Sequence, residues 1–138
     1  MAVKILPLKQ FRLLKEWAKL FKITNDTVIA YGNVIYSNKP LYPDVLEHEL
    51  VHLEQQKRHG LATFTKNYLN DKSFRLEMEV SAFKAQFASI QDTGLRDAVI
   101  QDAIIALSSG LYGKVTVKEA KKLLGIKEEK KLDVSKLS

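Results

Sequence analysis

LYPDVLEHELVHLEQQKRHG, residues 41–60, contains the segment HELVH at positions 48–52. We expect a helix that begins near Pro43-Asp44, because proline and aspartate are favoured in a first helical turn, and that ends at Gly60. On a helix, residues four apart lie on the same face, one turn from each other. His48 and His52 can therefore direct two imidazole nitrogens at one metal ion.

Glu49 directly follows the first of these histidines and is expected to contact a water bound to the metal ion. It lies about 100° around the helix from His48, which is too far round for a third ligand of the same ion. It is close enough to reach a water at the fourth position of the ion, as the H-E-x-x-H pattern requires. The alternative is an ordinary charged helix whose two histidines lie in solvent or in the core.

A catalytic zinc site needs a third protein ligand. The chain has no cysteine, so this ligand must be a histidine or a carboxylate. His59 follows His52 by seven residues and lies about 10.5 Å further along a regular helix, so it is not expected to bind the same ion. Glu77 and Glu79, in the downstream run RLEMEVSAF, are the candidates. They lie about 200° apart around a helix, so only one can face the ion, and both could instead be surface charges.

Three pieces of the sequence together resemble a known group of enzymes: HELVH, the following Gln55-Gln56, and Glu79-Val80-Ser81-Ala82-Phe83. They are similar to the zincin metallopeptidases that use a glutamate as third ligand, often called gluzincins. The pattern is closest to small bacterial and phage-encoded peptidases with an HELxHxxQQ-type helix and a later E-x-E-A-Y/F-type helix. The resemblance spans residues 34–86.

This resemblance implies a Zn²⁺ site whose ligands are His48, His52 and Glu79, with Glu77 in place of Glu79 in an alternative alignment. Many gluzincins carry an aspartate four residues after the glutamate ligand, where it orients a zinc histidine. This chain lacks it and has Phe83 there, or Ser81 if Glu77 is the ligand. The partners that orient the two histidines are therefore left unassigned.

The resemblance also implies a function, namely zinc-dependent hydrolysis of a peptide bond in a peptide or protein substrate. Glu49 would be the general base that takes a proton from the attacking water. Tyr112, in the loop SSGLYG, is the first candidate for stabilising the oxyanion, ahead of His59 and Arg75.

The other parts of the chain predict a mostly helical α+β fold, a zincin-like minimal domain with a short β-hairpin before the HELVH helix. Strand-forming runs at residues 27–31 and 34–36 flank Gly32-Asn33, which is typical of a two-residue hairpin turn. A peptide substrate could add to this hairpin as a further strand, or the hairpin could only cover the core. The apolar periodicity predicts further helices at residues 8–21, 61–68, 73–90, 95–107 and 117–124.

Finer expectations follow for these elements. Leu46, Leu50 and Leu53 lie on the side of the HELVH helix away from the histidines and are expected to anchor it in the core. Ser73 and Thr116 are expected to cap helix N-termini. We expect residues 1–125 to form one domain and residues 126–138 to be a charged, mobile tail.

Composition limits the choice of partners. The chain is 46% hydrophobic and 28% charged, as in ordinary globular proteins, and no stretch has the length of a membrane span. Because the opening MAVKILPLKQF lacks the apolar region of a signal peptide, we expect a cytoplasmic protein, in the host cell if the chain is viral. The formal charge of +6 comes largely from lysines near the C-terminal end, so nucleic-acid binding is not favoured.

Two other functions stay open at this point. The first is a catalytically inactive zinc-binding protein with a structural or interaction role in a phage or bacterial assembly. The second is a basic, nucleic-acid-associated domain.

Overall fold

The computed structural model describes residues 3–127 of the 138-residue chain. Within these residues, six α-helices and a three-stranded sheet form a mostly helical α+β fold, as the sequence predicts. The predicted tail falls mainly on residues 128–138, outside the described residues. Ile126, at its start, packs against the core beside α6. None of the helices in residues 3–127 has the length and the apolar content that crossing a membrane requires.

The sheet is small and lies close to the N-terminus. Its strands are β1 (Lys4–Leu6), β2 (Val28–Tyr31) and β3 (Val34–Ser37), in the order β1-β3-β2. β2 and β3 form the predicted antiparallel hairpin, in which Tyr31 pairs with Val34 across the turn. Gly32, in that turn, has φ +68°, a left-handed conformation that glycine adopts without strain. β1 pairs in parallel with β3 and was not predicted, because three residues are too short for a recognisable alternation.

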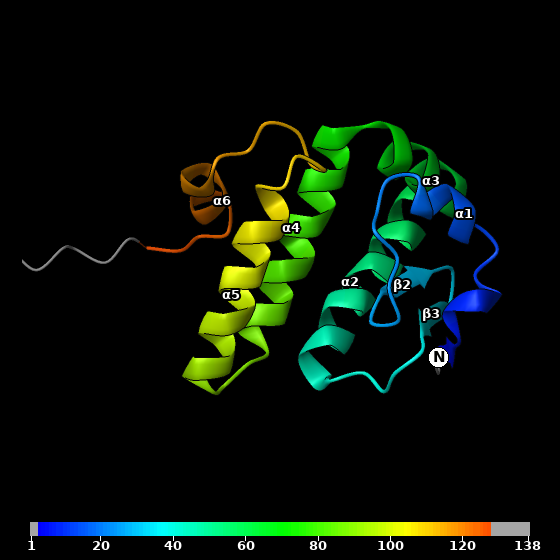
Figure 1. The fold of residues 1–138 in the computed structure, drawn as a ribbon, viewed down its shortest axis with the longest axis horizontal. Coiled ribbons are helices and arrows are strands. Elements are labelled where there is room, and N and C mark those ends of the chain that lie inside the picture. Colours follow the sequence, from blue (N-terminus) through cyan, green and yellow to red (C-terminus); the bar gives the residue numbers. More distant parts are fainter. Residues whose placement is uncertain (1–2, 128–138) are drawn as a thin grey trace, which may run out of the picture.

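Three long helices carry the rest of the fold. Figure 1 shows α2, α4 and α5 side by side and running alternately up and down, with the sheet beside α2 and with α6 at the side of α5. The helices are the 3-10 turn η1 (Leu8–Gln10), α1 (Leu14–Ala18), α2 (Pro43–His59), α3 (Leu61–Asn70), α4 (Lys72–Ala88), α5 (Thr93–Leu107) and α6 (Val117–Leu123).

The single helix predicted over residues 8–21 is wrong. The chain forms η1, passes through an extended Phe11, and then forms the short helix α1. The ring of Phe11 packs within 5.0 Å, centroid to centroid, of both Trp17 and Tyr36. Packing of these rings between the short helix and the sheet overrides the helical periodicity, which is only a weak local preference.

Two predicted N-caps have different outcomes. Thr116 caps α6 in a full capping box with Glu119, as expected. Ser73 does not cap α4, because the carboxylate of Asp71 accepts hydrogen bonds from the backbone N–H groups of Ser73 and Phe74. The helix therefore begins at Lys72.

The buried face of α2 is polar, contrary to the prediction that leucines anchor it. Leu46, Leu50 and Leu53 are only half-buried. The buried residues of α2 are Asp44, His48, Glu49, His52, Gln55 and Gln56. A buried polar group is costly unless it is hydrogen-bonded. This face must therefore be matched by polar groups on β2 and α4, the elements that α2 packs against.

Two apolar cores flank this polar face. The first joins the N-terminal segment, β2, α3 and α4 around Trp17, Phe64 and Tyr68. The second joins α4, α5 and α6 around Leu107 and Tyr112. The contact between α2 and α4 lies at the seam between the two cores, and it holds the polar residues in place.

The α2–α4 contact generates a prediction on Ala82. This residue is 0% exposed and lies on the stripe of α4 between Glu79 and Gln86, both of which contact side chains of α2. Ala82→Leu should push the helices apart and lower the free energy of unfolding by about 1–3 kcal/mol, measured by urea denaturation. The exposed Lys84→Leu on the same helix should change it by less than about 0.5 kcal/mol. Equal effects of the two substitutions would show that the helices do not pack closely at Ala82.

Candidate metal centre

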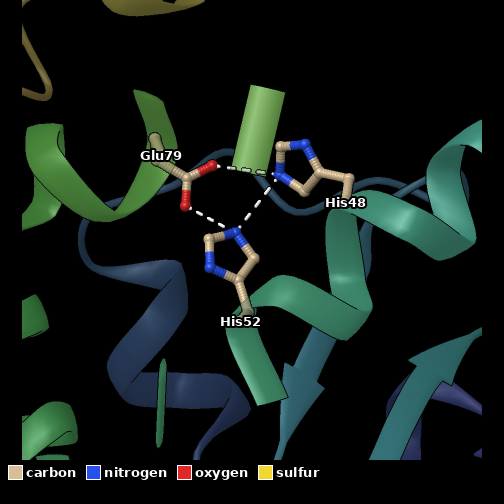
Figure 2. Close-up of side chains that lie close together, drawn as sticks. All are labelled: His48, His52 and Glu79. Carbon is tan, nitrogen blue, oxygen red and sulfur yellow. Dashed lines mark hydrogen bonds and ion pairs between the residues drawn. The ribbon is translucent and has the colours of Figure 1, made fainter. Parts of the chain in front are cut away.

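Three buried side chains converge between α2 and α4. His48 and His52 come from α2 and Glu79 from α4, and each points toward the other two (Figure 2). The Nε2 atoms of the two histidines are 3.2 Å apart. Nε2 of His48 is 3.3 Å from Oε1 of Glu79, and Nε2 of His52 is 2.7 Å from Oε2. One potential ligand atom from each residue therefore faces a common point.

Helical spacing explains how each helix supplies its part. His48 and His52 are four residues apart on α2, as expected for ligands on one face. On α4 the buried polar residues Arg75, Glu79 and Gln86 fall four and seven residues apart, again on one face. Glu77 lies outside this stripe and is exposed. Of the two glutamates considered from the sequence, Glu79 is therefore the one that meets the histidines.

Two glutamine amides orient the imidazole rings. Nδ1 of His48 is 2.9 Å from Oε1 of Gln86, and Nδ1 of His52 is 2.9 Å from Oε1 of Gln55. The amides cannot be turned round, because Nε2 of Gln86 donates to Asp44 and Nε2 of Gln55 donates to the carbonyl of Met78. Each Nδ1 must then carry the proton and donate it to the amide oxygen. The lone pair on each Nε2 is left for a metal.

The donor set and two of its three distances are compatible with zinc. Two ligands of a tetrahedral zinc ion at about 2.0–2.1 Å from the metal lie about 3.3–3.4 Å apart. The Nε2–Nε2 separation of 3.2 Å and the separation of 3.3 Å between His48 and Glu79 match this edge length, whereas the 2.7 Å between His52 and Glu79 is shorter. Two histidines and a carboxylate are also a ligand set of catalytic zinc sites. The group could therefore hold a metal ion.

The charges within the group stabilise one another. Burial alone would lower the pKa of His52, but the carboxylates of Glu79 and Glu49 outweigh it and raise this pKa from 6.5 to about 9. Burial would likewise raise the pKa of Glu79, yet the two histidines hold it well below 4.5. When no metal is bound, a proton on His52 thus balances the Glu79 carboxylate, at the place where a metal cation would do so.

Glu49 lies beside these three side chains and is 7% exposed. Burial raises the pKa of its carboxyl above 4.5, whereas the neighbouring histidines lower it. It lines a pocket of about 290 Å³ that is also bordered by His48, His52 and Glu79. The residue predicted as general base and the three predicted ligands therefore face the same space.

Two tyrosines border the same pocket, one from each core. The hydroxyl of Tyr68, on α3, donates a hydrogen bond of 2.9 Å to Oε2 of Glu79. Tyr112, the predicted oxyanion donor, is 7% exposed and lines the pocket from the loop between α5 and α6. Burial raises the pKa of both phenols, and the charge of Glu79 raises them further, so both stay protonated as hydrogen-bond donors.

The two weaker candidates for the oxyanion lie elsewhere. His59 is exposed at the end of α2, where its ring packs edge-on against Phe74 at 5.3 Å. It does not belong to the metal-binding group, as its position two turns beyond His52 predicts. Arg75 is buried but does not line the pocket, because its guanidinium is bonded to backbone carbonyls.

Sequence reasoning missed four residues of the site: Asp44, Gln55, Tyr68 and Gln86. Spacing carried a signal for two of them, since Asp44 lies one turn before His48 and Gln86 lies seven residues after Glu79. The Gln55-Gln56 pair was noticed as part of a pattern, but without a role. Tyr68 is on a different helix from both groups of ligands, so no sequence spacing connects it to them.

Comparisons of this chain with family models, with curated proteins and with solved structures find no match. The resemblance to zincins therefore rests on the residues of the site alone.

The orienting amides generate a first prediction for this site. Gln55→Leu and Gln86→Leu should each weaken zinc affinity by about 10–100-fold, because the imidazole loses the acceptor that fixes its tautomer. Competition with a chromophoric chelator measures the affinity. Gln101→Leu, at an exposed position of α5, is the matched control and should bind zinc as the wild type does. Unchanged affinity in both folded site variants would contradict the orienting role.

The raised pKa of His52 generates a second prediction. Below about pH 9, zinc must displace the His52 proton, so its apparent affinity should rise about tenfold per pH unit with the release of one proton. Calorimetry in buffers of different ionisation enthalpy counts the protons released. Because the folded-state pKa is the raised one, this proton stabilises the metal-free protein fully below about pH 6.5, and the effect is lost as pH rises through about 9. Affinity that is independent of pH would contradict this assignment.

Proposed function

We propose that the protein is a zinc-dependent peptidase in which His48, His52 and Glu79 hold the ion and Glu49 is the general base. The observation that carries the proposal is the placement of Glu49 in one pocket with the three ligands. A purely structural zinc site is closed by four protein ligands, whereas this group has three and borders a pocket.

The bound zinc would lower the pKa of a water to about 7 and polarise the substrate carbonyl. Glu49 would accept the proton of the attacking water and pass it to the leaving amine. Burial supports the acceptance of this proton, since a carboxylate with a raised pKa is a stronger base than an exposed one. The hydroxyl of Tyr112 would donate a hydrogen bond to the oxyanion that forms on the substrate.

The edge of the sheet favours a peptide in an extended conformation as the substrate. β2 is an edge strand, and its residues Val28 and Ala30 line the pocket. Because Tyr31 pairs with Val34 across a two-residue turn, the backbone groups of Val28 and Ala30 point away from β3. The carbonyl of Ala30 already accepts a hydrogen bond of 2.8 Å from Gln56. A substrate strand would therefore pair at Val28, further from the turn.

Glu49→Gln is the central test of this proposal. The variant should bind one equivalent of zinc and lose at least about 100-fold in kcat, because the amide cannot accept the proton. Metal content is measured by elemental analysis and turnover with a fluorogenic peptide library. Glu47→Gln, an exposed neighbour on α2, should behave as the wild type.

The outcomes separate this proposal from its rivals. Wild-type protein without about one equivalent of zinc would contradict the metal site. Equal turnover by Glu49→Gln and the wild type would contradict the base alone. Zinc binding without turnover of any peptide would favour a structural or interaction role, and a steep salt-dependent shift with DNA would favour a nucleic-acid-associated domain.

A further inference from the structure

Arg75 is a buried cation without an acidic partner in the described part of the chain. It is 2% exposed, and the ion pairs found within residues 3–127 do not include it. Its guanidinium is satisfied by backbone carbonyls instead. Nε and Nη2 donate to the carbonyl of Leu111 at 3.0 and 2.8 Å, and Nη1 donates to the carbonyl of Tyr68.

These bonds join two segments that are far apart in the sequence. Tyr68 belongs to α3 and to the first apolar core, while Leu111 directly precedes Tyr112 and lies beside the second core. The planar fork of arginine suits this task, because it can donate in two directions at once with a fixed angle between them. An apolar residue of similar size would fill the space but would leave both carbonyls without these donors.

The loop that carries Tyr112 packs side chains against the second core, but few hydrogen bonds join it to other elements. It connects α5 to α6 and contains Gly110 and Gly113, both at φ +98°. The hydrogen bond of the backbone N–H of Leu111 to Ser109 stays within the loop and has a length of 3.5 Å. Leu111, between these glycines, is the point at which the loop is tied to α4 by two hydrogen bonds.

We propose that Arg75 is a positioning residue that holds Tyr68 and Tyr112 at the metal centre. Arg75 lies one helical turn before Glu79 on the same face of α4. The positions of Glu79 and of both tyrosines are therefore fixed relative to the same helix. Tyr68 then meets Glu79, and Tyr112 reaches the pocket. The contacts of Arg75 do not involve the metal. Only the use of this positioning in catalysis therefore rests on the proposed function.

The first experiment uses metal-free wild-type protein and nitrogen-15 NMR of the arginine side chains. The Nε–H of Arg75 should exchange with water at least about 100-fold more slowly than those of the exposed Arg12 and Arg58, because it is buried and bonded to Leu111. Exchange as fast as at Arg12 and Arg58 would overturn the proposal without any substitution having to fold.

The second experiment uses 3-fluorotyrosine, which reports on all five tyrosines of the chain. In Arg75→Lys and Arg75→Met, the fluorine signals of Tyr68 and Tyr112 should shift or broaden, with the smaller change in the lysine variant. Those of Tyr36, in the sheet, and Tyr42, which is 75% exposed, should stay in place. Unmoved signals of Tyr68 and Tyr112, or equal changes at all tyrosines, would show a merely structural role and overturn the proposal.

Hydrolysis measured on the same proteins separates this inference from the proposed function. In a protein that cleaves peptides, Arg75→Lys should lower kcat about tenfold with little change in KM, and Arg75→Lys with Tyr112→Phe should be no slower than Tyr112→Phe alone. Losses that multiply would overturn action through Tyr112. If the wild type cleaves no peptide, the proposed function fails, and the two NMR experiments still decide whether Arg75 positions the tyrosines.

Discussion

The contact between α2 and α4 is the constraint on which the rest of the structure depends. It places a carboxylate from one helix against two imidazoles from the other in a buried setting, where charge is costly unless it is paired. A proton on His52 or a bound cation meets this requirement at the same point in space. The architecture around the contact can be understood as the means of holding Glu79, His48 and His52 at these distances.

Satisfying the polar face of α2 accounts for much of the surrounding structure. Gln56 bonds to the backbone of β2, Gln55 to a carbonyl of α4, and Asp44 to Gln86. Each bond compensates a buried polar group and fixes the rotation of α2 relative to its neighbours. Amides stand where many zinc sites use a carboxylate, so the histidines are oriented without a carboxylate in direct contact with either Nδ1.

The position of the site at the seam between two apolar cores gives it access to groups from both. Tyr68 is anchored in one core and Tyr112 in the other, and both border the pocket. Phe83 packs edge-on against the ring of His48 at 4.7 Å, which shields that side of the imidazole from water. A low-polarity wall of this kind strengthens the interactions of Glu49 and Glu79 with the histidines, because little water screens them.

The sequence by itself determined the helix that bears the histidines, the hairpin before it, the N-cap at Thr116 and the two candidate glutamates. All of these follow from local periodicity, turn chemistry or spacing along one element. Only the tertiary structure decided that Glu79 rather than Glu77 meets the histidines, that Gln55 and Gln86 orient them, and that Tyr68 belongs to the site. It also decided that α2 buries its polar face and leaves its leucines half-exposed. The reason is physical, because hydrophobic periodicity assigns the apolar side of a helix to the core. α2 instead lies between the edge strand β2 and a polar stripe of α4. Only the positions of these elements in the folded protein show that they supply hydrogen-bond partners to the polar face of α2.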